Sequence, residues 1–133
     1  MSLVETGFLL ALNPRDRNHD WALNLLREAR SGRLKLYLSP AAPIELSLIL
    51  KSRGLAEKEA ALVLEAMGLA ISRYTRLVYP PPTLEVASLA ASLRERHPEL
   101  TFFDSLHAAV AISNKLEYRD LDETVRRVVE EES

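Results

Sequence analysis

A single carboxylate at the start of an otherwise apolar segment is the first feature of this chain that could do chemistry. Residues 101–111 read TFFDSLHAAVA, a run of small and apolar residues typical of a helix in a core, with Asp104 in its first turn. An ionised carboxylate is rarely buried without a partner. Asp104 therefore either closes the helix N-terminus in a capping box with Thr101, or it faces a cleft and binds a cation together with other acids.

Three further acids stand where predicted elements begin or end. Glu5 follows a short apolar run, Glu45 lies in the first turn of the helix after the second predicted strand, and Asp120 follows the last predicted strand. Because open parallel sheets place ligands beyond the carboxyl ends of their strands, we expect these acids to converge with Asp104. Converging carboxylates raise one another's pKa unless a cation neutralises them. Oxygen ligands in a chain without cysteine suit Mg²⁺ or Mn²⁺ rather than zinc.

Each of these acids also has an ordinary structural explanation. Glu5 fits an exposed loop residue, and Glu45 complements the dipole of its helix. Asp120 and Asp122 both fit a turn or a helix cap. The hypothesis of a metal site depends on all four placements occurring together, since any one of them alone would be unremarkable.

The elements that would position these acids alternate between strands and helices, which indicates an α/β fold with a mostly parallel sheet. Apolar runs and alternation predict the strands, whereas caps, prolines and helical spacing predict the helices. The predicted strands are residues 3–4, 34–38, 77–79 and 116–118. Three of the predicted helices are residues 6–12, 56–73 and 83–96. The other four are a helix that starts at Asp16, Asn18 or Asp20, one with Pro43 in its first turn, one that begins at 101–104, and one capped by Asp122.

Composition narrows the classes of protein to which the chain can belong. Its 133 residues suit a single domain over 1–133, with no linker or repeat and 47% hydrophobic residues. The formal net charge of −2 is not that of a strongly basic nucleic-acid binder. The chain has no apolar run long enough to cross a bilayer and no visible signal peptide, so we expect a cytoplasmic protein. Its four glycines are too scattered to build the phosphate loop of a nucleotide-binding domain.

Three segments resemble the motifs of PIN domains, and best those of the toxin-type (VapC-like) single-domain members. Residues 5–12 (ETGFLLAL) look like the opening motif, an acid followed by Thr or Ser after the first strand. Residues 38–46 (LSPAAPIEL) are similar to the second acidic motif. Residues 101–111 match the third, with the acid, Leu-His and Ala-Ala in place. The resemblance implies a three-layer α/β/α fold with about seven helices and a short central sheet of four to five strands.

The resemblance also implies a metal-dependent ribonuclease that holds Mg²⁺ or Mn²⁺. The acids that it assigns to the metal and to catalysis are Glu5, Glu45, Asp104 and Asp120, with Asp122 as the alternative fourth acid. Thr6 either supports the site through its hydroxyl or caps a helix. His107, one turn after Asp104, either reaches the same rim or is a packed helix histidine. Glu5 departs from the family, whose first acid is normally Asp.

The same resemblance implies partners. Single-stranded RNA would be contacted by basic residues near the motifs, for which Arg15, Arg17 and Arg119 are candidates, although they are equally plausible as ordinary surface charges. A small antitoxin protein and a second copy of the chain are the other expected partners, and the helical faces 44–48 and 62–69 could serve that contact or belong to the core. The competing hypothesis is a catalytically weak or inactive PIN-like scaffold that acts as an interaction module.

Overall fold

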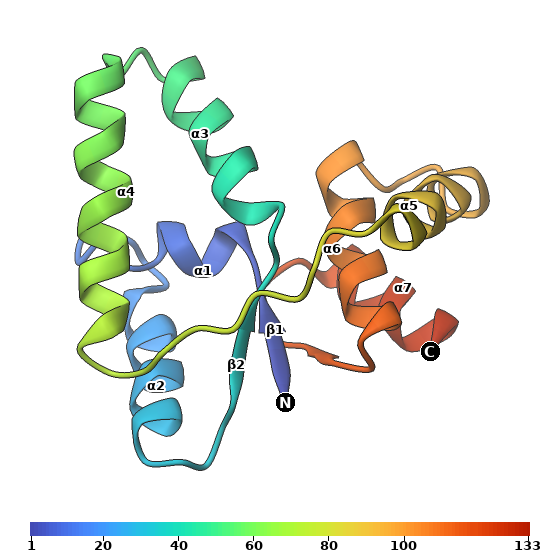
Figure 1. Ribbon diagram of the computed structural model, residues 1–133, viewed down its shortest axis with the longest axis horizontal. Coiled ribbons are helices and arrows are strands. Elements are labelled where there is room, and N and C mark those ends of the chain that lie inside the picture. Colours follow the sequence, from blue (N-terminus) through green and yellow to red (C-terminus); the bar gives the residue numbers. More distant parts are fainter.

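The computed structural model describes residues 1–133 as seven helices and three strands, which confirms the α/β class. Figure 1 shows the strands at the centre of the molecule with helices on both sides. The strands are β1 (Ser2–Val4), β2 (Leu36–Leu38) and β3 (Glu117–Tyr118). The helices are α1 (Thr6–Leu10), α2 (His19–Arg30), α3 (Ala42–Ser52), α4 (Glu57–Ser72), α5 (Leu84–Arg96), α6 (Phe102–Ser113) and α7 (Glu123–Glu132).

The central sheet is parallel and has the order β2-β1-β3. Leu3 of β1 pairs with Tyr37 on one side and with Tyr118 on the other. The sheet is smaller than the four to five strands expected, because Val78 forms only an isolated bridge with Tyr37. Prolines 80–82 follow that bridge, and a residue without an amide hydrogen cannot continue a ladder.

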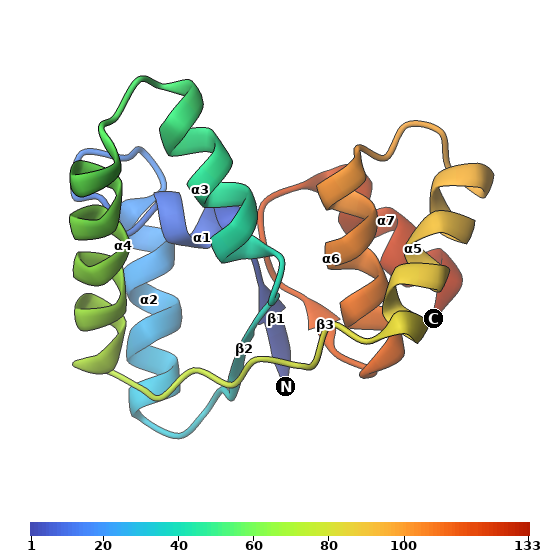
Figure 2. The same cartoon turned by 45° about the horizontal axis from the view of Figure 1, so that its top comes forward.

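Two hydrophobic clusters cover the two faces of the sheet and produce the expected three layers. One cluster joins β1 and β2 to α1, α2, α3 and α4, and the other joins the sheet to α5, α6 and α7. Figure 2 shows the same division, with the first four helices on one side of the strands and the last three on the other. The carboxyl ends of β1 and β3 lie near α1, α3 and α6.

The helix boundaries depart from the expected ones by only a few residues. The first helix ends at Leu10 rather than at residue 12, because the amides of Leu12 and Asn13 bond to carbonyls three residues back, at Leu9 and Leu10, instead of four. Of the three candidate residues for the start of the second helix, Asn18 occupies the N-cap position. The last helix is capped by Asp122 as expected, since its carboxylate accepts the amide hydrogen of Val125 at 3.0 Å.

Four large apolar side chains on the outer layer of the fold are not part of the core. Ile44 and Leu48 on α3, and Leu62 and Leu69 on α4, are between 55% and 61% exposed. The helical faces 44–48 and 62–69, for which burial was one of two explanations, are therefore solvent-facing at these positions. No helix combines the length and the apolar character that crossing a membrane requires.

The C-terminal helix is fastened to α5 by an ion pair with a measurable pH dependence. Glu132 accepts hydrogen bonds from Arg96 at 2.7 Å and from His97 at 2.9 Å. These bonds, above all the one from Arg96, lower the pKa of the Glu132 carboxyl to about 2. Because this pKa is lower in the folded state than the ordinary 4.5, the contact stabilises the fold above pH 4.5 and is lost as the pH falls toward 2.

We therefore predict that Glu132→Gln lowers the denaturation midpoint at pH 6 and that the difference from the parent shrinks between pH 4.5 and pH 2. Urea unfolding followed by circular dichroism at several pH values measures this difference. Glu130→Gln, an exposed change on the same helix without an ion pair, is the matched control and should follow the parent. A difference that stays constant down to pH 2 would contradict the assignment.

Candidate metal centre

The acids singled out in the sequence line one pocket beyond the carboxyl ends of β1 and β3. The pocket has a volume of about 360 Å³ and combines residues from α1, α3, α6 and the turn between β3 and α7. Segments far apart in the sequence thus contribute to one surface, as the parallel sheet predicted. Its lining residues are Glu5, Thr6, Gly7, Leu10, Glu45, Ile49, Asp104, Asp120, Leu121 and Asp122.

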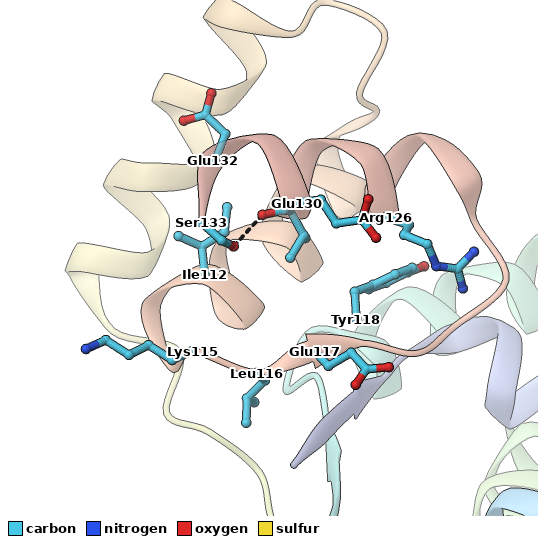
Figure 3. A pocket seen from close by; sticks show the side chains of 10 residues that line it. Ile112, Lys115, Leu116, Glu117, Tyr118, Arg126, Glu130, Glu132 and Ser133 are labelled. Carbon is cyan, nitrogen blue, oxygen red and sulfur yellow. Dashed lines mark hydrogen bonds between the residues drawn. The ribbon is translucent and has the colours of Figure 1, made fainter.

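A larger cavity of about 730 Å³ lies elsewhere, between the end of α6, β3 and α7 (Figure 3). It shares no lining residue with the acid-lined pocket. Figure 3 shows Tyr118 and Arg126 side by side, and the guanidinium of Arg126 lies 5.9 Å from the centre of the Tyr118 ring. The grouping of acids, rather than the cavity size, identifies the smaller pocket as the place where a cation could bind.

Two glutamates and a histidine form the tightest group at this pocket. One potential ligand atom from each of Glu5, Glu45 and His107 lies within 4.8 Å of the other two. The Nε2 atom of His107 is 2.9 Å from Glu45 Oε1 and 4.0 Å from Glu5 Oε1. Glu5 and His107 are buried and Glu45 is partly exposed. Carboxylates from the N-cap of α1 and from α3 therefore meet at the ring of a single buried histidine.

His107 is held in place by a contact that the sequence did not reveal. Its Nδ1 atom lies 2.7 Å from the hydroxyl oxygen of Ser39, which is completely buried at the end of β2. The Phe103 ring stacks near the imidazole, with the two ring centres 6.5 Å apart. His107 is thus both a packed helix histidine and a member of the acidic group. A lone serine before Pro40 carries no pattern from which this role could have been recognised.

The charges of the glutamates and the histidine stabilise one another. Burial alone would lower the pKa of His107, but the hydrogen bond to Glu45 and the charges of Glu5, Glu45 and Asp104 outweigh it and raise the pKa. Burial likewise opposes ionisation of Glu45, yet hydrogen bonds from His107 and Thr6 lower the pKa of its carboxyl. An imidazolium paired with an ionised Glu45 is the arrangement that these shifts favour.

The surroundings of Glu5 oppose its ionisation. Burial raises the pKa of Glu5, and the nearby charge of Asp120 adds to this rise. His107, the amide of Gly7 at 3.1 Å and the hydroxyl of Tyr118 at 3.0 Å offset only part of it. Burial also raises the pKa of Tyr118, so the phenol keeps the hydrogen that it donates to Glu5. A positive charge added at this point would favour the ionised form of Glu5.

Asp120 is committed to the backbone of α1 and of its own turn. Its Oδ2 atom accepts the amide hydrogens of Glu5 at 2.7 Å and of Phe8 at 3.0 Å, and its Oδ1 atom accepts that of Leu121 at 2.7 Å. Burial raises the pKa of Asp120, and these three bonds oppose the rise. Glycine is required at residue 7, because a Cβ there would overlap Asp120 Oδ1.

Asp104 caps its helix and also lines the acidic pocket. Its Oδ2 atom accepts the amide hydrogen of Thr101 at 3.2 Å, and Thr101 Oγ1 accepts that of Asp104 at 3.2 Å, which completes the capping box. The same carboxylate lines the acidic pocket, where its Oδ1 atom accepts no hydrogen bond from the protein. Capping uses one oxygen and leaves the other free, although Asp104 lies outside the tightest group of three.

Of the remaining candidate residues, Thr6 contacts the acidic group, whereas the three arginines lie outside the pocket. The Thr6 hydroxyl donates to Glu45, and α1 is capped instead by the Glu5 side chain, so Thr6 supports the acidic group rather than the helix end. Arg15 and Arg17 are exposed in the connection between α1 and α2, outside the lining of the pocket. Arg119 also lies outside it and pairs with Glu117 at 3.0 Å. The structure does not bring these three arginines into the pocket.

The donor set of this pocket fits a hard divalent cation. Carboxylate oxygens dominate it, no cysteine is available, and a buried carboxyl with a raised pKa gains most from an added positive charge. Glu5, Glu45 and the free oxygen of Asp104 are the groups that would hold the ion. His107 already donates a hydrogen bond to Glu45 and so would act beside the ion rather than as an obligatory ligand.

Comparison with known proteins agrees with this description. The sequence matches the model of the PIN domain over residues 2–130. The fold is similar to the crystal structure of VapC20 from Mycobacterium tuberculosis, a Sarcin-Ricin loop cleaving toxin, with a TM-score of 0.69 and 21% sequence identity over 96% of this chain and 94% of that one. No curated protein sequence matches the chain. Because the family model spans nearly the whole sequence, the chain belongs to the PIN domain family.

Proposed function

We propose that this chain is a divalent-metal-dependent ribonuclease that cleaves RNA internally and serves as the toxin of a toxin-antitoxin pair in the cytoplasm. The single observation that supports it most is the meeting of Glu5, Glu45 and Asp104 at one pocket in a member of the PIN domain family. The similarity of fold to VapC20, a toxin that cleaves the Sarcin-Ricin loop, supports the same assignment. Mg²⁺ or Mn²⁺ is the cofactor that the oxygen ligands favour.

In this proposal the acids have two kinds of role. Glu5, Glu45 and Asp104 hold the cation, which when bound supplies an acidified water and neutralises charge at the attacked phosphate. Asp120 belongs to the same set, and its hydrogen bonds from the amides of Glu5 and Phe8 favour a role in fixing the position of Glu5. Asp122, the alternative fourth acid, lines the pocket while capping α7.

Neighbouring side chains keep the two glutamates in position. Thr6 and His107 both donate to Glu45 Oε1, which leaves its second oxygen uncommitted. Tyr118 donates to Glu5 Oε2, and the amide of Gly7 donates to Glu5 Oε1. Because these donors are fixed by the fold, the carboxylates need little reorganisation when an ion or an RNA phosphate arrives.

An inactive scaffold is the alternative that one observation favours. His107 already pairs with Glu45 at 2.9 Å, so the carboxylate of Glu45 has a positive partner without an ion. Glu5 also stands where the family normally has Asp. If the histidine permanently takes the place of the cation, the chain would retain only binding to RNA or protein. Direct measurement of metal binding separates the two functions.

The proposed partners besides RNA are an antitoxin protein and a second copy of the chain. The exposed apolar residues Ile44 and Leu48 on α3, and Leu62 and Leu69 on α4, support a contact with another protein, since apolar area on a surface gains free energy when it is covered. Arg15, Arg17 and Arg119 remain proposed RNA contacts outside the pocket itself.

We predict that Asp104→Asn reduces Mg²⁺- or Mn²⁺-dependent RNA cleavage by at least about a hundredfold, because the ion loses a charged ligand. The fold should remain, since asparagine also supports a helix start. Gel analysis of a labelled RNA and thermal unfolding measure the two effects. Asp20→Asn, an exposed acid in the first turn of α2, is the matched control. Undiminished cleavage by Asp104→Asn would refute the assignment of this residue.

We predict that the protein binds Mn²⁺ at millimolar concentration or tighter and that Glu5→Gln and Glu45→Gln each weaken this binding. Calorimetric titration or the electron spin resonance of free Mn²⁺ measures the affinity. Glu28→Gln, a surface acid outside the pocket, should leave it unchanged. If no binding is detected at millimolar Mn²⁺, the scaffold is the correct function.

We predict that the protein is a dimer in solution, with twice the monomer mass by static light scattering. Substituting Leu48→Glu or Leu62→Glu should shift the equilibrium toward monomer if these faces meet, because a charge would enter an apolar contact. Leu84→Glu, a change at an exposed leucine on α5, is the control. A monomeric parent at all accessible concentrations would contradict the dimer.

A further inference from the structure

The most exposed aromatic ring of the chain stands in the first turn of α6, next to the acidic pocket. Phe102 is 58% exposed, although a large apolar side chain gains free energy by burial. The guanidinium carbon of Arg94 on α5 lies 4.8 Å from the centre of this ring. Phe103 meets it edge to face, at 5.6 Å between ring centres and an angle of 88°. The ring is thus supported from within the fold while much of it faces solvent.

A buried serine links Arg94 to the backbone of Phe102. The hydroxyl of Ser105 accepts a hydrogen bond from Arg94 Nη1 at 2.6 Å and donates one to the carbonyl oxygen of Phe102 at 2.6 Å. Ser105 is completely buried, so this junction is protected from water. A ring and a guanidinium fixed in this way lose little conformational freedom when a planar group stacks on them.

The pair differs from the other arginine or lysine contacts with aromatic rings in this structure. In the three others the ring belongs to Tyr37, Tyr74 or Tyr118, each of which is at least partly buried. Arg94 also forms no ion pair with any carboxylate within 4.0 Å, so its charge is available to a phosphate. The guanidinium lies over the Phe102 ring, and the exposed remainder of the ring next to this cation suits a nucleotide, whose base stacks and whose phosphate is negative.

The position of this pair relates it to the candidate metal centre. Phe102 precedes Asp104 by two residues within one helical turn, and Asp104 lines the acidic pocket. A helix rises about 1.5 Å per residue, so the backbones of the two residues are only a few ångströms apart, but side chains two residues apart project to different sides of the helix. The ring therefore lies outside the lining of the pocket, and a polynucleotide would reach it by passing around the start of α6.

We propose that Phe102 and Arg94 form a stacking platform for an unpaired nucleobase beside the metal centre and so select single-stranded RNA. The proposal rests on the proposed function for its substrate but concerns binding rather than cleavage. Bases in a duplex are already stacked and paired, whereas those of a single strand or a loop are free to stack on an aromatic ring.

The test measures the affinity for a fluorescein-labelled single-stranded 12-nucleotide RNA by anisotropy in Mg²⁺. An Asp104→Asn background keeps the RNA intact. Adding Phe102→Ala or Phe102→Leu should weaken binding on the order of tenfold, the usual effect of removing a stacked aromatic side chain. Phe102→Trp should restore the affinity, and its indole fluorescence should be quenched by RNA relative to the background that contains Trp21 alone. Leu84→Ala is the control at an exposed apolar residue elsewhere and should change nothing.

A blunt RNA duplex separates stacking from charge. Its affinity should be insensitive to Phe102→Ala, whereas an equal loss on duplex and single strand would overturn the proposal. Unchanged single-strand affinity of Phe102→Ala, or an unquenched Phe102→Trp, would also overturn it. If the native chain cleaves RNA but Phe102 does not affect binding, the platform is wrong and the nuclease stands. If binding depends on Phe102 but no cleavage occurs, the platform stands and the nuclease is wrong; absence of any RNA binding refutes both.

Discussion

The structure depends on carboxylates from distant parts of the chain being held together around one buried imidazole. Glu5 follows β1, Glu45 lies on α3 and His107 on α6, yet their ligand atoms lie within 4.8 Å of one another. Charges at such a distance in a partly buried site require compensation. In the free protein the hydrogen bond from His107 lowers the pKa of Glu45, while burial raises the pKa of Glu5. The protein therefore compensates the negative charge of an ionised Glu5 only in part, and a bound divalent cation would supply the missing positive charge.

The rest of the fold serves to keep that group in place. Asp120 fastens the start of α1 to the end of β3 by accepting the amide hydrogens of Glu5 and Phe8, and the absence of a side chain at Gly7 makes room for it. Ser39 at the end of β2 fixes the orientation of His107. Each of the three strands therefore contributes a contact at its carboxyl end. Parallel strands bring these ends to one edge of the sheet, which is why a small sheet is sufficient.

Much of this arrangement could be predicted from the sequence because it follows from local patterns. The α/β class, the seven helices and the gathering of acids beyond the strand ends came from periodicity, caps and the segment 101–111. Strand 77–79 was overestimated because hydrophobic composition does not show that Val78 pairs only once. Ser39 and Tyr118 could not be recognised, since a buried serine and a strand tyrosine acquire their roles only through tertiary contacts. The capping box of Asp104 could be predicted from the sequence, but not that one of its carboxylate oxygens stays without a hydrogen bond.

The occupancy of the pocket by an ion is the central claim, and diffraction tests it most directly. Crystals soaked in Mn²⁺ should give an anomalous difference peak between the carboxylates of Glu5 and Glu45, with ligand distances of about 2.0–2.3 Å and Asp104 on the same side. A peak there would show that a metal ion compensates the negative charge of Glu5. A map without a peak in the pocket, with His107 still bonded to Glu45, would contradict the account.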